Sequence, residues 1–397
     1  MKVLHVIPSV SPLRGGPSHA VLGMVRALRG RGCDAEIACT DDDGPGRLDV
    51  PLDRMTERDG VPVRFFARFS PGLSALREFQ YSAPLGRWLG GNLAGYDLVH
   101  VHAVFSYAST RAMQWARRLG KPYVVRPIGQ LSAWSLGQKA AKKRLYLALA
   151  ERRNLRGAAG IHCTSEAERR DVMGFDPRLP AFVSPIGIDP PEWRAGAREA
   201  VRGRFGLRHG DFVILYLGRL HPKKGLDILL DAVAALPDVA LVIAGSGDAR
   251  YEERLRQRAA APGFGGRVHF AGFVAGAEKD LLLQGSDVFA LPSEHENFGI
   301  AVLEALMAGL PVVVSPGVAL EDFVRQIGAG VVVEPQRDVF AAALRCLVAG
   351  GAAKGEERER IRREAAGAYA WDGIARGLVA TYGEILPRGR GGIRNHE

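Results

Sequence analysis

Short β-branched runs alternate with helical patterns along the first half of the chain. Between residues 17 and 30, apolar side chains recur every three to four positions, which is the spacing of one helix face. Because strand-like and helical segments alternate, the pattern predicts a parallel, doubly wound α/β sheet. The predicted strands are Val3–Ile7, Glu36–Thr40, Val61–Phe66, Leu98–His102, Tyr123–Ile128 and Gly160–Cys163.

The second half of the chain repeats this alternation and predicts a second α/β domain. Its predicted strands are Phe212–Leu217, Ala240–Ala244, Val268–Phe270, Val288–Leu291, Val312–Val314 and Gly330–Val333. The join lies near Pro185–Pro191, which is rich in proline and glycine. Ligands of such sheets bind at the carboxyl ends of the strands, so two facing domains would place an active site in the cleft between them.

Length and composition agree with two domains of ordinary globular character. The chain has 397 residues, of which 47% are hydrophobic and 24% charged. Its net charge of +10 lies entirely in residues 1–190, which hold 27 Lys and Arg against 17 Asp and Glu, whereas residues 191–397 hold 26 of each. This excess favours an anionic partner such as a membrane surface, a lipid phosphate or nucleic acid, or else serves solubility alone.

The sequence does not predict a membrane-spanning or secreted protein. No apolar run reaches the roughly 18 residues that span a bilayer. The first ten residues, MKVLHVIPSV, are interrupted by His5 and Pro8 and fit a buried strand better than a signal peptide. The four cysteines are scattered, as expected of reduced thiols. We therefore expect a cytoplasmic protein, with attachment to the inner face of the cytoplasmic membrane as an alternative.

Two glutamates flank the start of a predicted helix in residues 291–315. The helix is expected to begin near Phe298 and to end at Gly309. Its first turn leaves N–H groups near Phe298–Ile300 without intrahelical partners, which suits phosphate or sugar oxygens. Glu296 precedes the helix, and Glu304 lies about two turns inside it. A solvated helix face is the alternative, but the apolar neighbours of Glu304 would make an unpaired carboxylate costly.

A second polar loop follows the strand Phe212–Leu217. Arg219 and Lys224 flank this loop, and Gly225 closes it before a helix. Two cations at the carboxyl end of a strand suit a diphosphate, with a simply solvated loop as the alternative. Lys223, one position away, is expected to be spare.

Together these segments resemble the retaining family-4, or group 1, glycosyltransferases of the GT-B fold. The chain carries their E-x-F-G-x4-E-A-x3-G pattern from Glu296 and their G-R-x4-K-G pattern from Gly218. The resemblance implies that Glu296 lies beside the transferred sugar, that Glu304 binds the nucleotide ribose, and that both cations neutralise the leaving diphosphate. It also implies backbone contacts to the donor from Val274, Asn297, Phe298, Gly299 and Ile300.

In the first half, the resemblance assigns weaker roles. Gly15 and Gly16 would allow close approach to the donor phosphates, and His102 would lie near the donor sugar. His100 is expected on the other face of its strand, in the core. Two stretches depart from the family pattern: Arg126–Gly129 stands where His-Gly is usual, and Ile186–Asp189 lacks the usual Asn.

The resemblance also fixes the expected domains. Residues 1–187 would form an acceptor-side Rossmann-like domain and residues 188–370 a nucleotide-sugar-binding one. Residues 371–387 would form a helix crossing back to the first domain, followed by a basic tail at 388–397.

Two further motifs are set aside. Gly245–Ser246–Gly247 follows a strand, but Arg250 replaces the third glycine of a dinucleotide fingerprint. Asp41–Asp43 mimics an acidic metal motif and is predicted to be a turn. No metal or cofactor is expected, because Arg219 and Lys224 would neutralise the diphosphate.

One predicted helix is basic and partly apolar. It carries Leu145, Leu147 and Leu149 among the cations Lys139, Lys142, Lys143, Arg144, Arg152, Arg153 and Arg156. Such helices often contact anionic membranes, and a solvated helix face is the alternative.

The sequence therefore predicts retaining transfer of a hexose-type sugar from UDP- or GDP-sugar to a hydroxyl of a glycan or lipid-linked acceptor, in cell-envelope or exopolysaccharide biosynthesis. Nucleic acid is not an expected partner. The alternatives are a catalytically silent nucleotide-sugar-binding subunit and another GT-B enzyme, such as a nucleotide-sugar epimerase.

Overall fold

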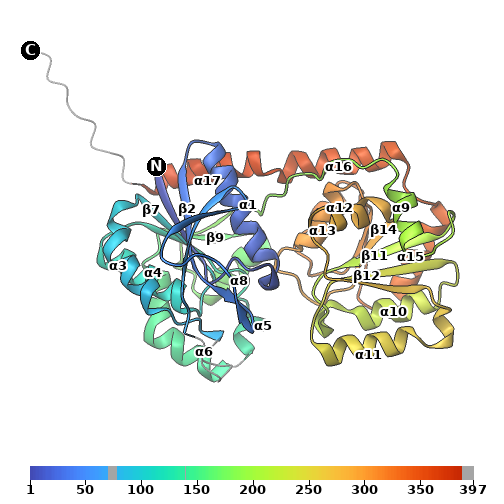
Figure 1. Cartoon of the computed structure of the whole chain (residues 1–397), viewed down its shortest axis with the longest axis horizontal. Coiled ribbons are helices and arrows are strands. Elements are labelled where there is room, and N and C mark those ends of the chain that lie inside the picture. The colour runs from blue at the N-terminus through green and yellow to red at the C-terminus, as the bar shows by residue number, and fades with distance from the viewer. Residues whose placement is uncertain (70–77, 139, 387–397) are drawn as a thin grey trace, which may run out of the picture. The chain divides into compact units, whose positions relative to one another are not determined.

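The computed structural model describes residues 1–69, 78–138 and 140–386. The chain divides into two compact units, one of Met1–Gly187 with Trp371–Glu397 and one of Ile188–Ala370. Each unit contains a sheet flanked by helices (Figure 1). The predicted tail at 388–397 and the predicted helix residue Lys139 lie outside the described residues.

The sheet of the first unit has eight strands in the order β10-β9-β8-β7-β1-β2-β6-β5. All pairs are parallel except β5 with β6. The strands are β1 (Lys2–Val6), β2 (Asp34–Thr40), β5 (Met55–Arg58), β6 (Val61–Phe66), β7 (Leu98–His102), β8 (Tyr123–Arg126), β9 (Gly160–Cys163) and β10 (Ala181–Val183). The main helices are α1 (Gly16–Gly30), α3 (Ala83–Asn92), α4 (Tyr107–Arg118), α5 (Ala133–Gly137), α6 (Ala140–Tyr146), α7 (Arg152–Arg156), α8 (Glu166–Phe175) and α17 (Trp371–Ile385).

The second unit has a six-stranded, fully parallel sheet in the order β13-β12-β11-β14-β15-β16. Its strands are β11 (Phe212–Leu217), β12 (Val239–Ala244), β13 (Val268–Gly272), β14 (Val288–Leu291), β15 (Val312–Val314) and β16 (Gly330–Val332). Its helices are α9 (Ala197–Arg204), α10 (Leu226–Ala234), α11 (Ala249–Ala259), α12 (Gly276–Gly285), α13 (Ile300–Met307), α14 (Glu321–Gln326), α15 (Arg337–Gly350) and α16 (Gly355–Tyr369).

The predicted parallel α/β architecture is confirmed, with all twelve predicted strands present at shifted or identical bounds. The strands missed by the sequence pattern are at the margins of the first unit. β5 is a polar edge strand, and β10 is three residues long and half-buried. Asp41–Asp43 was predicted to be a turn, but Asp42–Asp43 forms a short antiparallel ladder with β4 (Gly46–Arg47). β5 and the ladder of Asp42–Asp43 with β4 lack the continuous apolar run that marks a buried strand, and the apolar run of β10 is only three residues long.

The last helix belongs to the first unit. α17 packs on α1, where a Cβ atom on Gly23 would lie 2.5 Å from the Trp371 indole nitrogen. Gly187 makes an equally close approach to Trp371, so glycine at both positions lets the indole lie against backbone.

Within the described ranges, no helix is long and apolar enough to cross a membrane. The four cysteines are free thiols, of which Cys33, Cys39 and Cys163 are buried and Cys346 is exposed.

Candidate functional site

Two loops of the second unit meet at the carboxyl ends of neighbouring strands β11 and β14. Gly225, which closes the β11 loop, has φ +71°, and a Cβ atom there would lie 2.0 Å from the Pro292 carbonyl oxygen. The N–H of Glu294 donates to the Lys223 carbonyl at 3.0 Å. Glycine at 225 therefore allows the two loops to touch backbone to backbone.

An ion pair joins the same two loops. Lys224 Nζ is bonded to Glu296 Oε1, and both side chains are largely buried. Ser293 Oγ donates to the same carboxylate oxygen at 3.1 Å. A carboxylate and an ammonium thus lie together 72 residues apart in sequence. The structure brings together one cation and one carboxylate of the predicted donor site.

Helix α13 begins two residues later than predicted, at Ile300. Gly299 is its N-cap residue, with φ +87°, a conformation that glycine adopts without strain. Phe298 is buried and lies edge-on to Tyr369, with ring centroids 6.1 Å apart. Asn297 precedes this anchor in the loop. The start of α13 carries the positive end of the helix dipole, and the N–H groups of Val302 and Leu303 donate to the Gly299 carbonyl at 2.9 and 3.1 Å.

Glu304, whose apolar neighbours in sequence would make an unpaired carboxylate costly, forms an ion pair. Lys279 of α12 donates to its Oε1 at 2.6 Å, and 17% of the glutamate side chain is exposed. Because Lys279 neutralises this carboxylate, the cost of an unpaired buried charge no longer supports a functional role for Glu304. The family resemblance is then the support for a contact to the ribose. Val274, in the loop between β13 and α12, is buried.

The position of Arg219 depends on a residue that the sequence analysis missed. Tyr216, fully buried on β11, donates its hydroxyl to the Arg219 carbonyl at 3.0 Å. Burial, with Glu296 nearby, raises the pKa of Tyr216 well above its usual value, so the hydroxyl stays a donor. An apolar strand pattern gives no signal for such a contact.

The Gly245–Ser246–Gly247 segment, which does not complete a dinucleotide fingerprint, packs against the loop that carries Arg219. Cβ atoms on Gly245 and Gly247 would lie 1.9 Å from the Gly218 carbonyl oxygen and 2.0 Å from that of Leu220. Leu220 N–H donates to Ser246 O at 3.0 Å. The glycines let the end of β12 approach the Arg219 loop closely.

In the first unit, the predicted Gly15 and Gly16 lie between β1 and α1. Gly15 has φ +76° and is the N-cap residue of α1, which begins at Gly16. Open space surrounds the position that a Cβ atom on Gly15 would take. Gly15 therefore begins this helix with open space beside its backbone, and the role of Gly15 and Gly16 at the donor phosphates stays a prediction.

A pocket of about 240 Å³ lies beside this helix start. Its polar lining is formed by Ser9, Arg14, Ser18, Glu78, Gln80, Ser106 and Gln130, and its apolar lining includes Ile7, Phe105 and Ile128. Hydroxyl, amide, guanidinium and carboxylate groups around apolar surfaces suit a polyhydroxyl ring. The sequence pattern gives no signal for this pocket, because its lining comes from short segments that lie far apart along the chain, between residues 7 and 130.

Strained backbone gathers at the pocket. Gln80, Ala103, Phe105 and Ile128 line it and have φ values of 54° to 68°, a range that residues other than glycine rarely adopt. Such conformations cost about 1–3 kcal/mol each and tend to cluster at ligand sites. The strain supports a binding role for the pocket.

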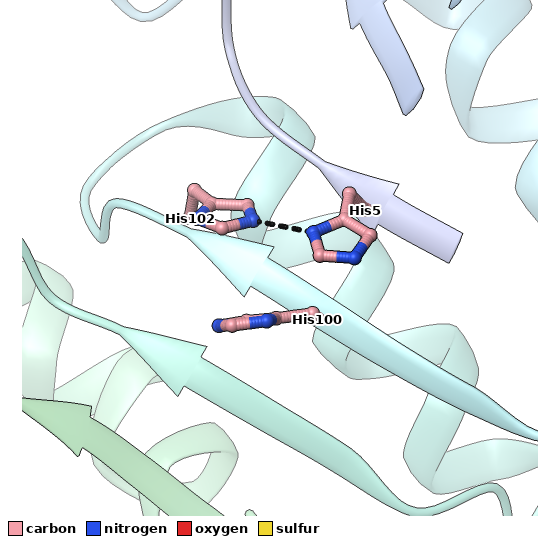
Figure 2. Close-up of side chains that lie close together, drawn as sticks. All are labelled: His5, His100 and His102. Carbon is pink, nitrogen blue, oxygen red and sulfur yellow. Dashed lines mark hydrogen bonds between the residues drawn. The ribbon is translucent and has the colours of Figure 1, made fainter. Parts of the chain in front are cut away.

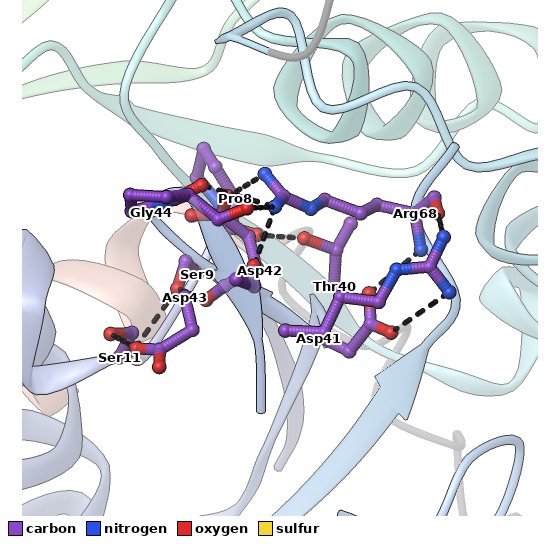
Figure 3. A network of polar contacts seen from close by, with 12 residues as sticks. Pro8, Ser9, Ser11, Thr40, Asp41, Asp42, Asp43, Gly44 and Arg68 are labelled. Carbon is purple, nitrogen blue, oxygen red and sulfur yellow. Dashed lines mark hydrogen bonds and ion pairs between the residues drawn. The ribbon is translucent and has the colours of Figure 1, made fainter. Parts of the chain in front are cut away.

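The Asp41–Asp43 segment belongs to a buried network of ion pairs (Figure 3). This network reaches the pocket through Arg14, which lines it. The Asp42 carboxylate is fully buried and binds Arg68, itself fully buried. Asp42 also accepts from Arg14 Nε at 2.6 Å and Nη2 at 2.9 Å. Because both arginines bind Asp42, the network fixes the guanidinium of Arg14 at the pocket wall.

His102 lies in a buried cluster with His5 and His100 (Figure 2). Its Nε2 lies 3.0 Å from Nδ1 of His5. His100 was predicted on the opposite face, which was wrong: its ring stacks on His102 with centroids 4.4 Å apart. Alternate residues of a strand share one face, so positions 100 and 102 must point the same way. The role of His102 at the donor sugar stays a prediction.

The hydrogen bonds of this cluster fix the tautomers of His162 and His100. His162 Nε2 donates to the Ser184 carbonyl at 2.7 Å, so its Nδ1 accepts from His100 Nε2 at 3.3 Å. His100 Nδ1 then accepts from the Tyr382 hydroxyl of α17 at 2.6 Å. His162 and His100 can therefore make all of these hydrogen bonds as neutral imidazoles.

Arg126, which stands in a stretch that departs from the family pattern, lies close to these histidines. Its side chain is fully buried, and its guanidinium nitrogens have no hydrogen-bond partner among the described residues. Burial lowers the pKa of Arg126 to about 10, and burial followed by the Arg126 charge lowers the pKa of His5, His102 and His162. Nitrogens of His5, His100 and His102 lie within 4.8 Å of one another, as metal ligands can. The neighbouring guanidinium charge disfavours a divalent cation there.

The cluster predicts acid sensitivity of the first unit. Burial lowers the pKa of His5 and of His162 to about 3, below the value of about 6.5 in an unfolded chain. Stability should be complete above pH 6.5 and fall below it, by about 1.4 kcal/mol per pH unit for each such histidine. Chemical unfolding followed between pH 7 and pH 5 measures this. A His162→Gln variant should show a shallower slope, and an unchanged slope would contradict the prediction.

Comparisons with known proteins agree with this architecture. Residues 15–187 match the model of the glycosyl transferase 4-like domain, and residues 197–367 match that of glycosyl transferases group 1. The solved structure of HepE from Anabaena, in complex with UDP and glucose, superposes with a TM-score of 0.75 at 21% identity, over 97% of this chain and 100% of that one.

Curated relatives carry the name D-inositol 3-phosphate glycosyltransferase. The relative from Geodermatophilus obscurus is 35% identical over 227 residues, which span 53% of this chain and 49% of that protein. The relative from Mycobacteroides abscessus is 30% identical over 96% of this chain and 88% of its own length. With both halves of the chain matched and the parallel sheets in place, the protein belongs to the group 1 glycosyltransferases of the GT-B fold.

Proposed function

We propose that the enzyme transfers a hexose-type sugar, with retention of configuration, from a UDP- or GDP-sugar to a hydroxyl of a glycan or lipid-linked acceptor. The observation that carries this proposal is the Lys224–Glu296 ion pair where the β11 loop meets the start of α13. A cation for the diphosphate and a carboxylate for the sugar lie together there. The UDP bound by HepE favours a uridine donor.

In the proposed reaction, the bond between the anomeric carbon and the diphosphate oxygen breaks, and the electron pair leaves with the diphosphate. Arg219, Lys224 and the N–H groups at Phe298–Ile300 stabilise that charge. The acceptor oxygen bonds to the anomeric carbon on the same face, and its proton passes to the departing phosphate oxygen. Glu296 stabilises the positive charge that develops on the sugar, while Glu304 holds the ribose. No metal is needed in this scheme.

The acceptor would bind in the first unit. The pocket beside Gly15 presents polar groups around apolar surfaces, and the relatives' name includes a phosphorylated cyclitol. A pocket of this size holds one ring of a longer acceptor. A lipid-linked acceptor would bring the enzyme to a membrane, and the positively charged first half of the chain suits an anionic one. Cell-envelope or exopolysaccharide biosynthesis would supply such acceptors.

Donor turnover distinguishes this proposal from its alternatives. UDP and GDP are first titrated by calorimetry, and the sugars of the preferred nucleotide are then assayed for diphosphate release with a panel of polyol and glycan acceptors. Acceptor-dependent release that persists in EDTA is expected. Donor isomerisation without acceptor would indicate an epimerase, and tight nucleotide binding without turnover would indicate a silent subunit.

A further inference from the structure

Residues 140–156 form one helical run, in which a π-helical turn (Leu147–Glu151) joins α6 to α7, and this run presents apolar side chains to solvent. Leu145 and Leu149 are 61% and 77% exposed, and four residues apart they lie on one side of the run. Trp134 of the preceding α5 is 50% exposed. Burial of these side chains against another surface would be favourable.

Cations surround these apolar side chains. Lys142, Arg152 and Arg153 are exposed on the same helical run. Between residues 131 and 165 the sequence has one acidic residue, Glu151. Its side chain is buried and bonded to the Thr110 hydroxyl. The exposed surface of this segment is therefore apolar and cationic, without an acidic group.

The same helical run contacts the pocket wall. Lys143 Nζ lies 5.4 Å from the ring centroid of Phe105, and the Tyr146 ring lies 6.1 Å from it. Phe105 lines the pocket. A surface that holds α6 would thus lie next to the residues that enclose the acceptor in the proposed reaction.

We propose that a docking face formed by Trp134, Lys142, Leu145, Leu149, Arg152 and Arg153 binds the surface of an anionic lipid bilayer. The leucines and the indole enter the interfacial region, and the cations meet lipid phosphates. Charge complementarity favours a bilayer over a protein, because the face combines apolar and cationic groups with no acidic ones. This inference deepens the transfer to a lipid-linked acceptor and rests on it for its functional meaning.

Vesicle sedimentation tests the docking face on the full chain. The protein should bind equimolar phosphatidylcholine and phosphatidylglycerol vesicles and bind phosphatidylcholine vesicles poorly. Leu149→Glu and Lys142→Glu should each lower the partition coefficient at least tenfold. The matched controls are Leu119→Glu, at the exposed apolar residue that follows α4, and Arg345→Glu, with the same change of net charge as Lys142→Glu but in the second unit. Both should stay within twofold of the unaltered protein.

Absence of binding to anionic vesicles would overturn the proposal, as would equal losses in the control variants. A dimer in light scattering that Leu149→Glu converts to a monomer would assign the face to a second copy instead. Release of nucleoside diphosphate from the panel of UDP- and GDP-hexoses, measured with the acceptor panel on the same samples, separates the two proposals. Normal vesicle binding without release would reject the proposed reaction alone.

Discussion

Replacing Lys224 with Ala should lower the rate of sugar transfer by about 10²–10³-fold, because removing one preorganised group that stabilises the leaving charge has this effect. The side chain is bonded to Glu296 and lies at the end of β11. When the donor binds, its diphosphate would replace the Glu296 carboxylate as the partner of the Lys224 ammonium. The measurement is kcat/KM for diphosphate release in the presence of acceptor, with circular dichroism to establish that the fold is intact.

Lys223→Ala is the matched control, because it removes a neighbouring cation from the same loop. The backbone carbonyl of Lys223, which accepts from Glu294, stays in place in that variant. Its kcat/KM should change less than tenfold. Full activity in Lys224→Ala would show that Lys224 does not stabilise the leaving diphosphate. Equal losses in both variants would mean that the positive charge of the loop matters, and not the position of Lys224.

The sequence pattern predicts the two sheets well because most of their strands are buried on both faces. β11 reads FVILYL, and all six residues are buried. Such a run cannot face solvent, so its position follows from composition alone. β5 has a polar, half-exposed pattern typical of an edge and gives no comparable signal. Prediction from sequence is therefore more reliable for a buried central strand such as β11 than for an exposed edge strand such as β5.

The candidate site is predictable where motif residues lie at strand ends, and not where distant side chains support them. Glu296 and Lys224 follow neighbouring parallel strands, so the rule for carboxyl ends predicts that they meet. Lys279, which pairs with Glu304, comes from another helix and belongs to no motif. Tyr216 supports Arg219 from within an apolar strand. Partners of this kind depend on tertiary packing.

The segment Asp41–Asp43 shows the same limit in the first unit. Three consecutive acidic residues favour an exposed turn, whereas Arg14 and Arg68, the latter 26 residues away, stabilise a buried Asp42. The side chain of Arg68 also donates to the Gly44 carbonyl at 3.0 Å. A charged segment can thus enter the interior when an arginine satisfies it.

Replacing Asp42 with Ala should lower the free energy of unfolding by about 3–5 kcal/mol, because Arg68 would remain buried without its carboxylate partner. The same change should release Arg14, which Asp42 binds through two nitrogens. Urea unfolding followed by circular dichroism measures the stability. A loss below about 1 kcal/mol, the range of surface ion pairs, would contradict the buried network.

Arg14→Ala separates the two roles of this network. It leaves the buried Asp42–Arg68 pair intact and removes a half-exposed cation from the pocket wall. Its stability should therefore change little, whereas the KM for acceptor should rise about tenfold with the KM for donor unchanged, as loss of one charged hydrogen bond predicts. If Arg14→Ala changed neither constant, the pocket would not be the acceptor site. Asp42 would then stabilise the fold without positioning a substrate contact.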